Sequence, residues 1–234
     1  MEDEDISVVF YTQYCPPGVR DIIANGTDAF VGKVDEFTVL KYPALPGGDL
    51  HLLEHEYRVF KHVGPHPRII AAKDFNELGL YLERAPNGTL NILLDKDLDV
   101  KLADLQCNHV SDEGEIIWFG ERGEPCRFYC PRGDEIVADV RTDLFALGST
   151  IYFIMLGYEV FPDIISGHEG WHDMVASRFE RGEFPNEPHL CAGITKKCWR
   201  QEYRSVDEVL NDIVVVERQT RGAADGRKSS LEEA

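Results

Sequence analysis

The chain has 234 residues, of which 43% are hydrophobic, and it carries a formal net charge of −18 at pH 7. This length and apolar content suit one large domain or two lobes, and they argue against a wholly disordered chain. The negative charge would repel phosphate backbones and anionic lipid headgroups, which argues against nucleic acid or a membrane surface as a partner.

The cysteine spacing and the apolar runs indicate the compartment. None of the six cysteines forms a Cys-x-x-Cys pair, and this pattern favours reduced thiols over a disulfide framework or a zinc site. The acidic N-terminus lacks the pattern of a signal peptide, and the longest apolar run, residues 144–156, is too short to span a bilayer. We therefore expect a cytoplasmic or nuclear protein without a transmembrane segment.

The first third of the chain favours an antiparallel sheet with one helix. After an N-terminal extension over residues 1–20, apolar residues at helical spacing predict a helix over residues 49–63. Short β-prone runs bounded by turn residues predict five strands. These runs are residues 22–24, 30–34, 38–41, 69–75 and 78–82.

Residues 91–104 contain two short apolar runs around an acidic turn, a pattern that predicts a β-hairpin. Because both ends of a hairpin return to one place, Asn91 and Asp104 are expected to lie side by side. An amide oxygen beside a carboxylate is a hard-oxygen site that suits Mg²⁺ and phosphate.

The remainder of the chain is mostly helical by pattern. Gly, Ala, Ser, Arg and Glu dominate residues 218–234, and this composition predicts a disordered tail. Apolar spacing and capping residues before it predict four helices. These are residues 139–157, 175–182, 194–203 and 205–216.

One cation and one carboxylate add to this pattern. Lys41 ends a predicted strand, and Glu56 follows in the predicted helix. Such a pair can meet between sheet and helix, and its ammonium can then reach a phosphate. A lone Lys and Glu carry little weight, because surface ion pairs are common. Lys41 and Glu56 are followed along the chain by a strand that ends at Glu83 and by the hairpin of residues 91–104. This sequence of elements makes a functional role for the pair more credible than the pair alone would.

That order resembles the protein kinase superfamily over residues 21–216. The resemblance implies an α+β, two-lobed protein kinase-like fold. Its antiparallel β N-lobe with one helix would cover residues 21–86, and a truncated, mostly helical C-lobe would cover residues 87–217. The resemblance also implies ATP and Mg²⁺ as cofactors, and a protein substrate or protein partner. The sequence gives no indication of the oligomeric state.

The resemblance assigns a role to each end of the nucleotide phosphates. Lys41 matches the family's strand-3 lysine, and Glu56 matches its partner on the helix. Asn91 and Asp104 match the two residues that hold Mg²⁺. In this family the lysine contacts the phosphates directly, and the metal ions neutralise the charge that develops during transfer.

The base of the nucleotide would meet a second group of residues. Leu82 matches the gatekeeper, and Glu83 to Ala85 match the hinge that hydrogen-bonds adenine. Gly26 stands where the family's phosphate loop has three glycines. Because glycine lets the backbone approach phosphate closely, a single glycine points to weaker nucleotide binding.

The motifs of the second half are also altered. Residues 123–132 resemble the end of the activation segment, and residues 143–148 resemble part of the central C-lobe helix. Arg132 stands where the family has a glutamate, and the arginine that pairs with that glutamate matches Arg204. Two arginines are therefore expected to face each other here.

The largest departure lies between Leu90 and Asn91. The family has two helices there, followed by the His-Arg-Asp segment that carries the catalytic base. Loss of a general base typically costs about 10²- to 10⁴-fold in rate. Residues 87–90 must also be extended to link the hinge to the hairpin.

We therefore expect a kinase-like domain that binds MgATP, with γ-phosphoryl transfer to protein Ser/Thr absent or very slow. Two alternatives remain open. In the first, the chain is a pseudokinase that acts as a binding or scaffold module. In the second, the sequence is that of a gene model or splice form that skips an internal exon of an active kinase.

Overall fold

The protein divides into two compact units, residues 1–122 and 123–234. Its described residues form an α+β fold, with an antiparallel five-stranded sheet in the first unit and five helices in all. No helix in this part of the chain combines the length and the apolar composition needed to cross a membrane. The structure is a computed structural model, and it describes residues 13–26, 29–89, 91–105, 109–110, 116–118, 124–133 and 138–232.

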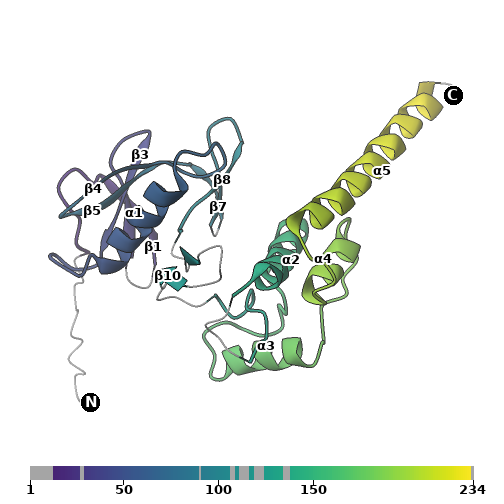
Figure 1. The fold of residues 1–234 in the computed structure, drawn as a ribbon. Coiled ribbons are helices and arrows are strands. Elements are labelled where there is room, and N and C mark those ends of the chain that lie inside the picture. Colours follow the sequence, from purple (N-terminus) through teal and green to yellow (C-terminus); the bar gives the residue numbers. More distant parts are fainter. Residues whose placement is uncertain are drawn as a thin grey trace, which may run out of the picture. The chain divides into compact units, whose positions relative to one another are not determined.

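The five-stranded sheet of the first unit follows the predicted strands. Its order is β1-β2-β3-β5-β4, and all neighbouring strands are antiparallel (Figure 1). β4 begins later than the predicted run, because Ile69 and Ile70 pair with Leu102 instead. The strands are β1 (Asp21–Asn25), β2 (Ala29–Lys33), β3 (Thr38–Pro43), β4 (Ala72–Asn76) and β5 (Gly79–Glu83).

The predicted helix of the first unit is α1 (His51–Val63), which packs on the sheet (Figure 1). Leu53 and Phe60 are buried in the core between helix and sheet. Residues three and four apart share one side of a helix, and Glu56 therefore lies on the same face, with its side chain fully buried. The periodicity that buries the apolar residues thus also places a carboxylate in the core.

β7 (Ile92–Leu94) and β8 (Val100–Leu102) form the predicted hairpin. The carboxylate of Asp95 orders its acidic turn by accepting hydrogen bonds from two amides of the turn. β6 (Asn87–Thr89) pairs with β7 as a third strand. Residues 87–89 are therefore extended, as a link between β5 and the hairpin requires, and Leu90 lies outside the described residues.

The hairpin belongs to the first unit. The amide of Ile70 donates to the carbonyl of Leu102 at 3.0 Å, and the amide of Leu102 donates to the carbonyl of Arg68 at 2.8 Å. Because these bonds attach β8 to the segment before β4, the units divide after residue 122 and not after residue 86, the predicted boundary. β9 (His109–Val110) and β10 (Ile116–Trp118) form a separate antiparallel pair.

Of the N-terminal extension predicted over residues 1–20, residues 1–12 lie outside the described part of the chain. The described remainder packs onto the sheet. The hydroxyl of Tyr42 donates to the carbonyl of Tyr14 at 3.2 Å, and their rings form an edge-to-face contact. The extension therefore covers the face of β3 opposite to the side on which Lys41 projects.

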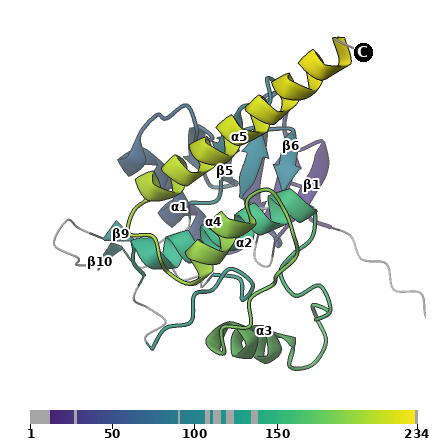
Figure 2. The same cartoon turned by 90° about the vertical axis from the view of Figure 1, so that its right-hand side faces the viewer.

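Four helices are described in the second unit, at or near the predicted positions. α2 and α4 lie side by side in both views (Figure 1, Figure 2). Gly148 permits this close approach, because a Cβ at this position would lie 2.7 Å from the Cβ of Cys198. The helices are α2 (Val140–Leu156), α3 (Trp171–Glu180), α4 (Ala192–Trp199) and α5 (Val206–Glu232).

α5 extends further than the composition predicts. A disordered tail was expected over residues 218–234, and the structure continues α5 through residues 218–232 of that range. The hydroxyl of Thr220 donates to the carbonyl of Val216 at 2.8 Å, and Arg221 pairs with Glu217 one turn earlier. An ion pair between residues four apart stabilises a helix by about 0.2–0.5 kcal/mol, and the pair of Arg221 with Glu217 supports α5 at this point.

Two arginines organise the loop before α2. The guanidinium of Arg127 is buried and donates to the carbonyls of Phe161 and Ile164 at 2.9 and 2.6 Å. Arg132 pairs with Glu124 at 2.8 Å. Arg132 therefore has a carboxylate partner close to it in sequence. The sequence-based expectation that Arg132 faces Arg204 did not predict this partner.

Candidate functional site

A cavity of about 390 Å³ lies in the first unit, lined by the five-stranded sheet, α1 and the hairpin. Residues 1–122 supply its whole described lining, so the site belongs to one unit. The cavity brings together all eight residues that the sequence predicts for ligand binding, metal binding or the ion pair. They are Gly26, Lys41, Glu56, Leu82, Glu83, Ala85, Asn91 and Asp104.

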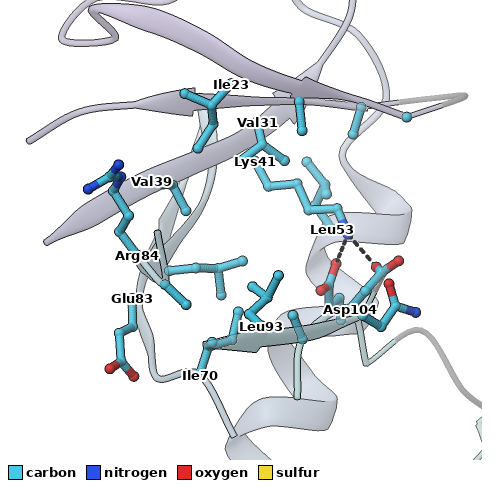
Figure 3. Close-up of a pocket in the computed structure, with 18 of the residues that line it drawn as sticks. Ile23, Val31, Val39, Lys41, Leu53, Ile70, Glu83, Arg84, Leu93 and Asp104 are labelled. Atoms are coloured by element: carbon cyan, nitrogen blue, oxygen red, sulfur yellow. Dashed lines mark hydrogen bonds and ion pairs between the residues drawn. The ribbon is translucent and has the colours of Figure 1, made fainter. Parts of the chain in front are cut away.

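One end of the cavity is apolar. Figure 3 shows Ile23 and Val31 of the sheet across the cavity from Ile70 and Leu93. Leu82 adds to the lining and is itself almost fully buried. Apolar side chains on two opposite sides suit a planar aromatic ring, because both faces of the ring would lose contact with water.

Lys41 lies between two carboxylates. Its Nζ is 2.8 Å from Oε2 of Glu56 and 2.5 Å from Oδ1 of Asp104 (Figure 3). The side chains of Lys41 and Glu56 are 13% and 0% exposed, so water screens this pair little. Burial lowers the pKa of Lys41, but its attraction to Glu56 and Asp104 outweighs burial and raises the pKa above its ordinary value. The ammonium is therefore charged at neutral pH.

Strand alternation explains why Lys41 faces the cavity. Val39 and Lys41 line it, while Leu40 and Tyr42 are fully buried on the other face of β3. Gly79 supports this strand from β5. Its φ is +142°, and a Cβ there would lie 2.2 Å from the carbonyl oxygen of Lys41. Only glycine fits this position. Gly79 is not among the site residues that the sequence predicts. Its position between two β-prone runs is the one sequence feature that indicates a special backbone conformation.

The hairpin brings Asn91 and Asp104 to the cavity. The amide of Ala103 donates to the carbonyl of Asn91 at 2.9 Å, which holds the two ends of the hairpin together. Asp104 has φ +61°, a left-handed conformation that is uncommon for residues with a Cβ. Aspartate adopts it more readily than most such residues do. The amide oxygen of Asn91 and the carboxylate of Asp104 fit Mg²⁺, which proteins often hold through one or two carboxylates together with substrate phosphates.

The linker after β5 offers one amide to a ligand. The amide of Glu83 donates to the carbonyl of Ala71 at 2.8 Å, and the amide of Arg84 donates to the carbonyl of Phe37 at 3.0 Å. Within the described residues, the amide of Ala85 has no such acceptor, and Ala85 lines the cavity. Of the three linker residues, Ala85 is therefore the one whose amide remains for a ligand.

The lining carries a surplus of negative charge. In its described part, carboxylates outnumber cations by four to two. Each carboxylate already accepts a hydrogen bond from a backbone amide or from Lys41. An anionic ligand would therefore need additional positive charge to bind well. The carboxylates are those of Asp49, Glu56, Glu83 and Asp104, and the cations are those of Lys41 and Arg84.

Comparisons with known proteins add no relative from which the site could be annotated. No protein-family model matches the chain. A search of curated proteins likewise finds no significantly similar sequence. The interpretation of the cavity therefore depends on its own geometry and chemistry.

Proposed function

We propose that the chain is a protein kinase-like domain that binds ATP with Mg²⁺ in this cavity, and that phosphoryl transfer by it is absent or very slow. One observation carries the proposal. The ammonium of Lys41, a cation of the sheet, meets the buried Glu56 of α1 and Asp104 of the hairpin at one end of an apolar cavity. Three separate segments thus supply the charges that a metal-bound triphosphate requires.

The base would occupy the apolar end. Ile23 and Val31 would cover one face of a purine, and Ile70 and Leu93 the other. The amide of Ala85 would donate to a ring nitrogen, which supplies the orientation that apolar contacts alone do not give. The apolar end of the cavity would therefore bind a purine ring without using a charged side chain.

The phosphates would occupy the polar end. Lys41 would donate to phosphate oxygens, and Asn91 and Asp104 would hold Mg²⁺. When bound, Mg²⁺ would supply positive charge that offsets the charges of the phosphates and of the Asp104 carboxylate. The buried carboxylate of Glu56 would hold the ammonium of Lys41 in place beside the phosphates.

The same cavity supports binding better than transfer. Transfer to a hydroxyl needs a carboxylate placed to accept the hydroxyl proton. Every carboxylate in the described lining already accepts a hydrogen bond from the protein, and two of the four accept it from Lys41. The segment that carries the catalytic base in the family is missing between Leu90 and Asn91, so we expect nucleotide binding with little turnover.

Thermal unfolding with and without MgATP tests the proposal. Nucleotide at 100 times its Kd should stabilise the folded state by about 2.7 kcal/mol and raise Tm accordingly. Lys41→Met should abolish this increase, while Lys33→Met should retain it, since Lys33 lies on the neighbouring strand outside the cavity lining. A release assay for radiolabelled γ-phosphate would measure turnover in the same samples.

The outcomes are separable. No increase in Tm at millimolar MgATP would contradict nucleotide binding and would favour an interaction module instead. An equal increase in both variants would place the nucleotide elsewhere. Phosphoryl transfer at rates typical of kinases, about 1–100 s⁻¹, would contradict the loss of turnover.

A further inference from the structure

The carboxylate of Glu83 joins three segments of the first unit. One oxygen accepts a hydrogen bond from the amide of Ala71 at 3.0 Å, and the other lies 3.3 Å from Nζ of Lys101. Ala71 precedes β4, Glu83 ends β5 and Lys101 lies in β8. The side chains of Lys101 and Glu83 are 13% and 29% exposed, so solvent screens this pair only in part.

This contact connects the two walls that would hold opposite ends of a nucleotide. Glu83 lies two residues before Ala85, whose amide remains for the base. Lys101 lies three residues before Asp104, at the phosphate end. A change in the spacing between Glu83 and Lys101 would therefore change the spacing between the two ends of the site.

The ion pair of Asp104 with Lys41 attaches the end of the hairpin to β3, and the remaining polar attachments restrain the hairpin less. Arg68 and Asp99 form an ion pair in which both side chains are more than half exposed, and such pairs contribute little. The two backbone bonds to the segment before β4 both involve Leu102, one through its amide and one through its carbonyl. The contact between Lys101 and Glu83 adds a side-chain attachment at the neighbouring residue of β8, and it leads to the end of β5 instead of the segment before β4.

We propose that Lys101 and Glu83 form a clasp that sets the separation of the base wall and the phosphate wall. The inference rests on the proposed nucleotide site and makes Lys101 a positioning residue for it. A ligand that uses both walls gains from having them already in place, because fixing them costs no binding free energy. A ligand that uses the base wall alone gains nothing from the clasp.

The clasp predicts a difference between two ligands in calorimetric titration. Lys101→Met should weaken binding of MgATP about tenfold, the scale of one partly buried charge-assisted hydrogen bond. The same variant should change binding of adenosine less than twofold. Lys101→Arg keeps the cation and should restore most of the MgATP affinity. Lys96→Met serves as the control, since Lys96 pairs with Asp97 in the exposed turn of the same hairpin.

An equal loss for both ligands would overturn the clasp, because it would mean that Lys101 only supports the fold. Unchanged MgATP affinity in Lys101→Met would overturn it as well, while the nucleotide site itself would stand. Amide hydrogen exchange of the ligand-free protein tests the clasp independently of nucleotide binding. The amides of Ile70 and Leu102 should exchange several-fold faster in Lys101→Met than in Lys96→Met, and equal rates would contradict the inference even if no nucleotide binds.

Discussion

The buried carboxylate of Glu56 gives Lys41 a role in stability beside its proposed role in ligand binding. Lys41→Met removes the cation and leaves a carboxylate with 0% exposure beside an apolar side chain. Breaking a buried ion pair from one side costs about 3–5 kcal/mol, so we expect a clear fall in the urea midpoint of unfolding.

The double variant Lys41→Met with Glu56→Gln separates the two roles of this lysine. Removing both charges should recover more than half of the lost stability, because the double variant no longer buries a carboxylate charge whose lysine has been removed. Nucleotide binding should stay abolished. If the double variant were no more stable than the single one, the pair would not be the source of the loss.

The raised pKa of Lys41 predicts how stability changes at alkaline pH. The ordinary pKa is 10.5, and the folded protein holds it higher. The contribution of the ion pair is therefore fully present below pH 10.5 and is lost as the pH rises through the folded-state pKa. Urea unfolding between pH 8 and 11.5 should show this alkaline loss in the unchanged chain. In the Lys41→Met and Glu56→Gln double variant, the same titration should give a shallower fall.

Single residues differ in how far the sequence reveals them. Four residues can be singled out from the sequence because their order along the chain resembles that of the protein kinase motifs. They are Lys41, Glu56, Asn91 and Asp104. Glu83, predicted as a linker residue of the site, lies in the lining of the cavity, and its carboxylate also contacts Ala71 and Lys101, which the sequence does not predict. Contacts of this kind connect residues that are far apart in the sequence, and no local sequence pattern predicts them.

At the scale of elements, Gly79 connects the turn before β5 to the site. Gly79→Ala would place a methyl group against the carbonyl of Lys41 in a backbone conformation that alanine resists. We expect a loss of about 3 kcal/mol in unfolding free energy and weaker MgATP binding, because β3 must move. Gly157→Ala is the matched control, with φ +79° but nothing within 4 Å of a Cβ.

Gly157→Ala should cost about 1 kcal/mol and leave nucleotide affinity unchanged. Denaturant unfolding and calorimetric titration of the two variants give both quantities. Equal effects of the two substitutions on affinity would show that the contact with Lys41 does not position the lysine.

The elements themselves were largely predictable. Alternation and helical spacing located the five strands and α1, since both patterns follow directly from which side chains must be buried. β6 was predictable as extended only because the short link to the hairpin requires it. The helical end of α5 was not predictable, because its composition of Gly, Ala and Ser describes average propensity and not the contacts between successive turns. The unit boundary was missed for a similar reason, because backbone bonds at Leu102 decide it.

At the scale of the whole molecule, the net charge predicts which form of nucleotide the proposed site would bind. The chain carries a net charge of −18, and carboxylates predominate in the described lining of the cavity as well. ATP without metal would meet repulsion from both. Removal of Mg²⁺ with EDTA should weaken ATP binding at least tenfold in calorimetric titration. Adenosine, which has no charge, should bind equally with and without EDTA, and a loss for adenosine would point to unfolding instead.

The confinement of the cavity to residues 1–122 has a thermodynamic consequence. A ligand shifts only those opening equilibria that disrupt its own contacts. Bound nucleotide would thus slow amide exchange in the sheet, α1 and the hairpin, whose residues form the described lining. The extent of this protection along residues 13–105 would map the segments that hold the ligand.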